Sequence, residues 1–350
     1  MSSNGNPCIL YGELYTKYKS EIISEVISKT NIEKNKLKHS KQNDVIIPCS
    51  GETAVDIAVA RCVPFDNVLL GGDLNIIRLH KYDGAFMAYQ LNSKRKIEIA
   101  KLAQGVSVVH LYGENLKSIN TFNPSLQEQQ KIVRLLSLLD ERIKVQNKII
   151  EDLKKLKCAI IDKVYSEIQG KEYSYGQLFD VVNERNKQME YSNILSASQE
   201  KGMVNRDDLN LDIQFERSNI NIYKIVKKGD YVIHLRSFQG GFAFSDKLGV
   251  CSPAYTILRP DSLLEYGYLS NYFTSQRFIK SLVLVTYGIR DGRSINVDEW
   301  LRMKITIPPK EHQQYIVKVI GTFERKIEDE EAYAAQLSIQ KQYLLRQMFV

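Results

Sequence analysis

The chain has 350 residues, of which 43% are hydrophobic, and this is enough for two ordinary domains with buried cores and for additional long helices. No apolar run approaches the roughly 20 residues of a membrane span. The first residues, MSSNGNPCIL, lack the basic and apolar regions of a secretory signal, so we expect a cytoplasmic protein. The net charge of +7 is compatible with a nucleic-acid partner, although so mild an excess does not predict one by itself.

Residues 1–120 have the pattern of a first domain. Apolar, β-rich runs at 45–47 and 75–79 indicate strands, and the stretch at 94–103 indicates a helix near the end of the segment. We therefore predict an α+β domain.

Residues 121–168 carry a long helical stripe. Positions spaced alternately by four and three, from 132 to 164, are apolar except at Gln146 and Lys157. This spacing is typical of a coiled-coil seam, and at about 1.5 Å per residue a helix of roughly 35 residues would span about 50 Å. The seam residues of this first helix are Ile132, Leu136, Leu139, Ile143, Ile150 and Leu153.

Residues 169–306 repeat the first domain at lower identity. The string NDVIIPCSG (43–51) matches GDYVIHLRS (229–237), FMAYQLNS (86–93) matches YLSNYFTS (268–275), and AQGVSV (103–108) matches TYGIRDGRSI (286–295). Strands are expected at 231–235 and 255–258, and a helix at 268–280, so this domain is also predicted to be α+β.

The two copies differ at their beginnings. Ile9 aligns with Ile194, which puts Met1 opposite about residue 186, so residues 173–185 have no counterpart in the first copy. We expect the first domain to lack an opening strand and turn, either through a different start site or because the element is supplied from elsewhere in an assembly.

Residues 307–350 repeat the long helix without a slip in register. Gln129 recurs as Gln313, an offset of 184 (313 minus 129), and the two polar breaks recur as Glu330 and Lys341. A chance amphipathic helix would not reproduce the breaks, so we predict two helices whose stripes face each other. The seam residues of the second helix are Ile316, Ile320, Phe323, Ile327, Leu337 and Leu344.

The order domain, helix, domain, helix predicts an antiparallel coiled coil. A compact domain usually has its ends close together, so residues 169–306 should return the chain beside the end of the first helix, with one domain at each end of the rod. In that arrangement we expect Gln146 to lie near Lys341 and Glu330 near Lys157, rather than each polar break meeting its own counterpart.

The helix starts carry the most specific strings of the chain. PSLQEQQKI (124–132) with LDERI (139–143), repeated as IPPKEHQQ (307–314) with His312 at a position usually acidic or glutamine, resembles the spacer region of the DNA-specificity subunit of type I restriction-modification systems. The resemblance covers nearly the whole chain, and each domain is similar to a target-recognition domain of that family.

The resemblance implies a noncatalytic reader of double-stranded DNA. Each recognition domain would bind one half of a bipartite, asymmetric site, and a rod of about 50 Å would allow a gap of fewer than about 15 base pairs. It also implies two methylation subunits docked along the helices and two restriction (motor-nuclease) subunits. No cofactor is expected on this chain, because S-adenosylmethionine would be bound by the methylation subunits.

Catalytic and metal-binding motifs are not found. The string NPSL (123–126) lacks the second proline and the aromatic residue of an amino-methylating loop and suits a helix start, while EDLK (151–154) suits a solvated helix face. The five cysteines and five histidines form no ligand cluster, so no metal site is predicted. A self-sufficient methyltransferase or nuclease, and a coiled-coil scaffold without a DNA role, are the alternatives.

Candidate DNA contacts lie on loops that follow matching strands, because base readout uses polar side chains and phosphate contact uses Lys and Arg. In the first domain the phosphate candidates are Lys34, Lys36, Lys38 and Lys41, and the base-reading candidates are Ser50 and Glu52. In the second domain they are Arg236, Ser237 and Gln239 on one loop, and Tyr287, Arg290 and Arg293 on another.

Overall fold

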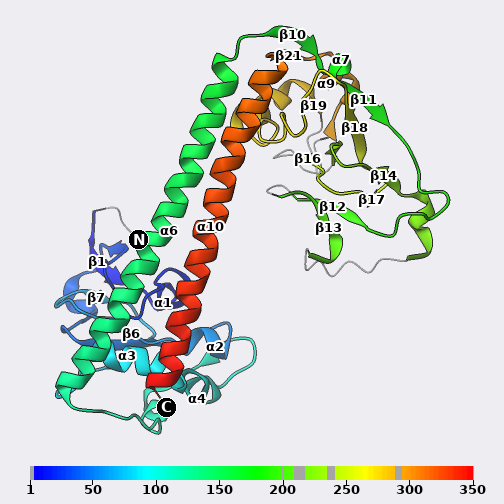
Figure 1. Cartoon of the computed structure of the whole chain (residues 1–350). Coiled ribbons are helices and arrows are strands. Elements are labelled where there is room, and N and C mark those ends of the chain that lie inside the picture. Colours follow the sequence, from blue (N-terminus) through cyan, green and yellow to red (C-terminus); the bar gives the residue numbers. More distant parts are fainter. Residues whose placement is uncertain (1–3, 199–200, 209–216, 235–240, 288–293, 350) are drawn as a thin grey trace. The chain divides into compact units, whose positions relative to one another are not determined.

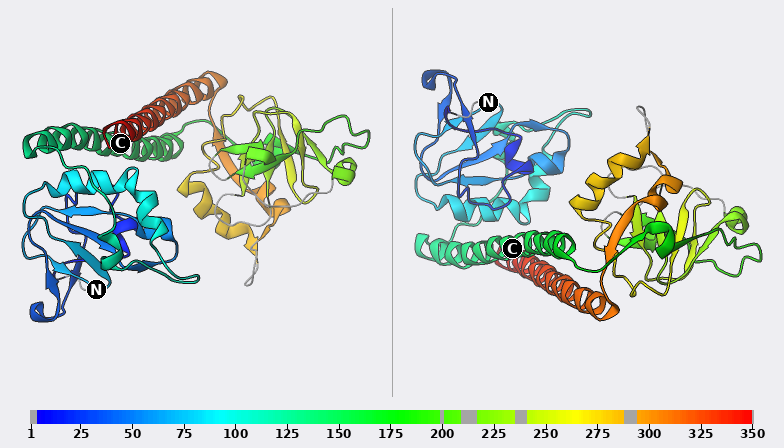
Figure 2. Two further views of the ribbon diagram at one scale, coloured as in Figure 1. Left: turned by 90° about the horizontal axis from the view of Figure 1, so that it is seen from below. Right: turned by 90° about the horizontal axis from the view of Figure 1, so that it is seen from above.

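The computed structural model describes residues 4–198, 201–208, 217–234, 241–287 and 294–349. The chain divides into two compact units: unit 1 is Met1–Ile149 with Glu330–Val350, and unit 2 is Ile150–Asp329. Each unit holds one mixed α/β domain and part of each of two long helices (Figures 1 and 2). The α+β class expected for both domains is confirmed.

The long helices begin at the strings that the sequence singled out. α6 spans Leu126–Glu167 and α10 spans Lys310–Met348. The backbone N–H of Ser125 donates to the Glu128 carboxylate (3.0 Å), and the N–H of Glu128 lies 3.4 Å from the Ser125 hydroxyl. This reciprocal capping box satisfies donors that a helix start leaves free, so the string at 123–126 is a helix start.

Within each unit the two helices pair antiparallel. In unit 1 the Gln146 amide donates to the backbone carbonyl of Glu330 (3.2 Å) and to its carboxylate, and in unit 2 Lys157 lies 2.7 Å from Glu324. Residue numbers therefore rise along one helix as they fall along the other. Every predicted seam residue is buried or half-buried, namely Ile132, Leu136, Leu139, Ile143, Ile150, Leu153, Ile316, Ile320, Phe323, Ile327, Leu337 and Leu344.

The expected pairing of the polar breaks was wrong. Gln146 lies in the middle of α6, and Glu330 lies in the middle of α10, so these equivalent residues meet each other. Lys341 instead pairs with Asp140 at 2.5 Å. The repeat offset of 184 relates this pair to the pair of Lys157 with Glu324. A contact between residues 146 and 330 is thus a property of the antiparallel pair.

The buried stripe shifts by one position where the helices end. Tyr165 and Phe349, rather than the seam positions before them, are buried, at 7% and 5% exposure. The reason is that each helix end packs on the domain of the unit in which it lies. Tyr165 of α6 lies 5.5 Å from Tyr268 in unit 2, and Phe349, just after α10, lies 5.2 Å from Phe86 in unit 1, measured between ring centroids.

The domain of unit 1 contains a four-stranded sheet in the order β2-β1-β7-β3, a three-stranded sheet in the order β6-β4-β8, and the pair β5–β9. Val45 and Ile47 of β4 pack with α3 residues, while Ile46 faces the other core cluster with Ile9, as the two-residue period of a strand requires. The elements are β1 (Asn6–Ile9), α1 (Glu13–Thr16), β2 (Ser28–Thr30), η1 (Lys34–Lys36), β3 (Lys38–His39), β4 (Asp44–Pro48), β5 (Ser50–Gly51), α2 (Ala54–Ile57), β6 (Arg61–Val63), β7 (Leu69–Leu70), β8 (Leu74–Ile77), α3 (Gly84–Asn92), α4 (Arg95–Lys101), β9 (Val109–His110) and α5 (Gly113–Leu116).

The domain of unit 2 contains a sheet in the order β11-β18-β15-β16 and the strand pairs β10–β21, β12–β13, β14–β17 and β19–β20. Its core is aromatic, with Tyr175 stacked on Trp300 at a centroid distance of 4.2 Å. The elements are β10 (Lys171–Ser174), α7 (Tyr175–Leu178), β11 (Phe179–Val182), β12 (Leu195–Ser198), β13 (Gly202–Asn205), η2 (Arg206–Asp208), η3 (Arg217–Ile222), β14 (Lys224–Val226), β15 (Tyr231–Ile233), β16 (Phe242–Phe244), β17 (Gly249–Cys251), β18 (Thr256–Pro260), α8 (Gln276–Ser281), η4 (Leu282–Val285), β19 (Thr286–Tyr287), β20 (Ser294–Ile295), α9 (Val297–Arg302) and β21 (Lys304–Ile307).

The four strands expected near residues 45, 75, 231 and 255 are present as β4, β8, β15 and β18. The helix expected at 268–280 was wrong in its first half, because α8 begins only at Gln276. Ser275 caps it by accepting from the Phe278 N–H (3.2 Å), and the residues before it form turns that bury Tyr268 and Phe273. Aromatic burial there outweighs the helical pattern.

Candidate nucleic-acid interface

The same turn precedes a central strand in each domain, at residues 41–44 and 227–230. The two aligned aspartates are buried: Asp44 is the first residue of β4 and is 1% exposed, and Asp230 precedes β15 and is 2% exposed. Each carboxylate accepts the backbone N–H three residues earlier, at 2.8 Å in both copies. The residue before each aspartate has a positive φ, 76° at Asn43 and 99° at Gly229, which is the left-handed backbone that asparagine and glycine adopt most readily.

Each buried aspartate holds an arginine from the neighbouring strand. Arg78 donates twice to Asp44 (2.9 and 2.8 Å), and Arg259 donates twice to Asp230 (3.0 and 3.1 Å). The hydrogen bonds that Arg78 donates to Asp44 raise the pKa of its guanidinium, so the charge is fixed. The sequence reasoning missed both arginines, although each lies at the end of a predicted strand, Arg78 within 75–79 and Arg259 just after 255–258.

A buried glutamine joins each domain to the helix that follows it. Gln129 is fully buried; its carbonyl accepts the Asp83 N–H (2.9 Å) and its amide donates to the Pro124 carbonyl (2.8 Å). Gln313 makes the equivalent bonds with Glu265 and Pro308, at 2.7 and 3.0 Å. The glutamine of the repeated string is therefore the connection between domain and helix, and it fixes their orientation within a unit.

The phosphate candidates of the first domain lie on one exposed segment. Lys34, Lys36, Lys38 and Lys41 belong to η1, β3 and the turn before β4, and all four are exposed. Lys36 pairs with Glu33 at 3.1 Å, whereas in the part of the chain that the structure describes the other three ammonium groups form no ion pair. The segment is thus a cationic surface, and its contact with DNA stays a prediction.

The two base-reading candidates of the first domain differ. Ser50 is 5% exposed, and its hydroxyl donates to the Asp73 carboxylate, so it supports the loop from inside. Glu52 is exposed just before α2, whose first turn is capped by Thr53. Of the pair, Glu52 alone presents its side chain at the surface.

The candidates of the second domain lie largely outside the described residues. Arg236, Ser237, Gln239, Arg290 and Arg293 cannot be placed, and Tyr287 is placed only as the last residue of β19. The bases of both loops are defined, because the His234 N–H donates to the Gly241 carbonyl (2.8 Å) and β19 pairs with β20. Their role in DNA contact stays a prediction.

Two repeated domains, each joined by a buried glutamine to one helix of an antiparallel pair, match one family. The model of the type I restriction modification DNA specificity domain matches residues 2–155 and again residues 170–338. The chain belongs to this family. The two matches account for both domains and most of both helices of this type I specificity protein.

Solved structures support the same fold. The S subunit of a type I restriction-modification system from M. genitalium aligns with a TM-score of 0.55 and 16% identity, covering 99% of this chain and 92% of that one. A chain from a study of complex assembly and conformational transition of the type I R-M system aligns with a TM-score of 0.59 and 16% identity, covering 89% and 83%. At this identity the likeness concerns the fold.

The described residues contain neither a membrane-spanning helix nor a cluster of metal ligands. None of the helices there is long and apolar enough to cross a membrane. No group of three or more His, Cys, Asp or Glu side chains in that part of the chain could hold a metal ion.

Proposed function

We propose that this type I specificity protein reads a bipartite DNA site, with one recognition domain for each half-site, and targets the methylation and restriction subunits to it. The observation that carries the proposal is the double match to the specificity domain, at residues 2–155 and 170–338. One copy would suffice to read one short sequence, so two copies with different loops favour two unrelated half-sites.

The cationic surface of unit 1 supports DNA contact in its domain. Three of its lysines carry ammonium groups without an ion pair among the described residues, and such charges neutralise phosphates and release counterions. Sequence reading would come from the loops, because phosphate contacts position a protein on DNA without identifying bases.

The half-site assignment can be tested with a footprint of the complex assembled with its methylation subunits. Arg236→Ala together with Arg293→Ala should abolish protection of one half-site and leave the other protected. Lys34→Ala together with Lys38→Ala should weaken binding to all sequences and lower the salt dependence by about 1 to 2 in logarithmic slope. Unchanged protection of both half-sites in the arginine variant would contradict the loop assignment.

Partner docking is proposed for the outer face of α6. Within unit 1 this face exposes Leu135 (46%), Leu138 (57%), Val145 (54%) and Ile149 (40%), in a helical stripe that the seam does not use. We infer that each methylation subunit binds the helix pair and that the two restriction subunits join through them. Leu138→Glu with Val145→Glu should prevent copurification with the methylation subunit, whereas Gln336→Glu on exposed α10 surface should not.

The chain itself is proposed to be noncatalytic and to act in the cytoplasm. S-adenosylmethionine would be bound by the methylation subunits. Purified chain with DNA and labelled S-adenosylmethionine should transfer no methyl group, and addition of the methylation subunit should restore transfer. Transfer by the chain alone would favour a self-sufficient methyltransferase.

A further inference from the structure

One sheet edge is open in unit 1 and covered in unit 2. β18 lies between β15 and β11, with Val181 of β11 opposite Leu258. In unit 1 β4 pairs with β8 as β15 pairs with β18, because Val45 lies opposite Ile77 and Tyr231 lies opposite Leu258. Among the described residues no strand pairs with the other edge of β8. Such an edge presents backbone N–H and C=O groups that can bind an extended segment.

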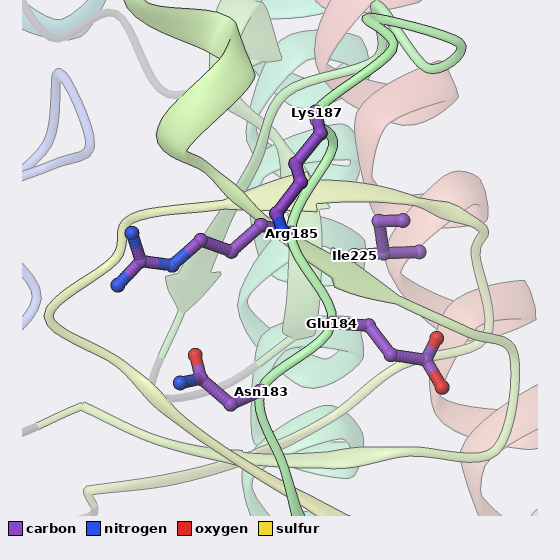
Figure 3. A pocket seen from close by; sticks show the side chains of 5 residues that line it. All are labelled: Asn183, Glu184, Arg185, Lys187 and Ile225. Carbon is purple, nitrogen blue, oxygen red and sulfur yellow. The ribbon is translucent and has the colours of Figure 1, made fainter.

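The segment that covers the edge in unit 2 also places a carboxylate beside it, in the lining of an open pocket. Glu184, just beyond β11, pairs with Arg259 (2.9 Å) and Lys227 (3.0 Å), and its backbone carbonyl accepts the Ile225 N–H (2.8 Å). Figure 3 shows the Glu184 side chain extending to the opposite side of the backbone from that of Arg185. The Arg259 hydrogen bond, followed by that from Lys227, lowers the pKa of Glu184.

Unit 1 has a hollow at the corresponding strands. It is lined by Lys38, His39, Ile76 and Arg78. By strand register these correspond to Lys224, Ile225, Ile257 and Arg259 of unit 2. Lys41 corresponds to Lys227, since each donates its backbone N–H to the aligned aspartate.

In the part of the chain that the structure describes, the hollow of unit 1 has no carboxylate in the place that Glu184 takes in unit 2. Among these residues Arg78 forms an ion pair with Asp44 and donates to the His39 carbonyl (3.5 Å), whereas Arg259 pairs with both Asp230 and Glu184. The Arg78 side chain is 40% exposed, compared with 28% for Arg259. Among the described residues no second acidic side chain pairs with Arg78, so a cationic hollow adjoins an unpaired strand edge.

We propose that the β8 edge and this hollow together bind an extended segment of another polypeptide, whose carboxylate pairs with Arg78 and Lys41. The bound segment runs antiparallel to β8, as β11 runs along β18, and its turn places the acidic side chain two to three residues beyond the paired strand. The inference concerns the unpaired β8 edge of unit 1 and holds whether or not the chain reads a bipartite site.

The charges favour this occupant over two others. A second copy pairing through its own β8 would bring Arg78 and the neighbouring lysines of both copies together without an added carboxylate, and like charges repel. A DNA phosphate would satisfy Arg78 but would leave the N–H and C=O groups of the strand edge unpaired.

The test uses a labelled peptide with the sequence of residues 170–187, GKEYSYGQLFDVVNERNK, and the intact chain. Fluorescence anisotropy should show saturable binding, and hydrogen exchange should slow in residues 74–79. A peptide with Glu184→Gln should bind about tenfold more weakly, because a charge-assisted hydrogen bond is lost. Lys41→Gln in the chain should weaken the original peptide, while the matched variant Lys34→Gln, outside the hollow, should not.

Three results would overturn the proposal. The peptide could fail to bind, it could bind with no sensitivity to either glutamine substitution, or the chain alone could form a dimer in which residues 74–79 are already protected. Protection of these residues by a DNA duplex but not by the peptide would instead identify an anion site. None of these results alters the footprint on which the proposed function rests.

Discussion

Replacing Lys341 should loosen the contact between the last helix and the first domain more than any other single change on α10. Its ammonium lies 2.5 Å from both Glu21 and Asp140, and its side chain is 13% exposed. It also lies 5.6 Å from the centre of the Tyr89 ring, whose hydroxyl donates to Asp140 (2.6 Å). Lys341→Met keeps most of the stem and leaves two carboxylates, at 9% and 13% exposure, without their cation.

The structure supplies both the magnitude and the control for this prediction. Removing one partner of a buried ion pair destabilises by about 3–5 kcal/mol. The matched variant is Lys157→Met, 184 residues earlier. Among the described residues Lys157 pairs with Glu324, which is 41% exposed, and an exposed pair contributes about 0.2–1 kcal/mol. The buried cluster should therefore be several times more sensitive than its counterpart in unit 2.

Hydrogen exchange followed by mass spectrometry can separate the units, which a single melting temperature cannot. Lys341→Met should raise exchange by about a hundredfold to a few thousandfold in α3 and in the last two turns of α10, and leave α7 to α9 unchanged. Lys157→Met should raise exchange less than about tenfold near Glu324. Equal effects of the two variants, or none from Lys341→Met, would refute the reasoning.

Three further outcomes follow from buried or paired groups. Gln129→Ala should destabilise unit 1 by about 1–3 kcal/mol in urea unfolding, because the Asp83 N–H and the Pro124 carbonyl lose their partner. The control Gln130→Ala, at an exposed position, should have little effect. Burial raises the pKa of the Cys62 thiol to about 12, so an alkylating reagent at pH 8 should label exposed Cys158 in the native chain and Cys62 only after unfolding. The hydrogen bond from Arg259 is the largest cause that lowers the pKa of Glu184 below its ordinary 4.5. The stability that this carboxylate contributes is therefore present above pH 4.5 and is lost as the pH falls through the lower pKa of the folded chain. Glu184→Gln should reduce this loss of melting temperature at acid pH.

The helix pair followed from sequence because its information is periodic and repeated. The seam from Ile132 to Leu153 and its copy 184 residues later fix two long helices, and the compactness of a domain fixes their antiparallel direction. The partner of Gln146 did not follow, because it depends on where each helix begins and ends. The structure puts residues 146 and 330 at the two helix centres, and equivalent residues meet there.

The domains were harder to predict because their contacts are distant in sequence. The alignment of Asp44 with Asp230 was correct, yet only the fold brings Arg78 to the first and Arg259 to the second. Ser50 follows its strand as expected, but the hydroxyl points to Asp73 inside the domain. Periodicity also favoured a helix from residue 268, where burial of Tyr268 produces turns.

The open edge of β8 corresponds to the edge of β18 that β11 covers in unit 2. Residues 173–185 of unit 2 form the end of β10, α7 and β11, and then supply Glu184. In unit 1 the described residues present, at the corresponding place, one unpaired strand edge and the cations around Arg78.

Mapping methylated adenines across the genome tests the central claim most directly. In cells that hold the methylation subunit, adding this chain should produce methylation at one bipartite motif, two short unrelated half-sites with a fixed nonspecific gap. Arg236→Ala with Arg293→Ala should relax one half-site and leave the other intact. Methylation that does not change with the chain, or that occurs at a single continuous motif, would contradict the account.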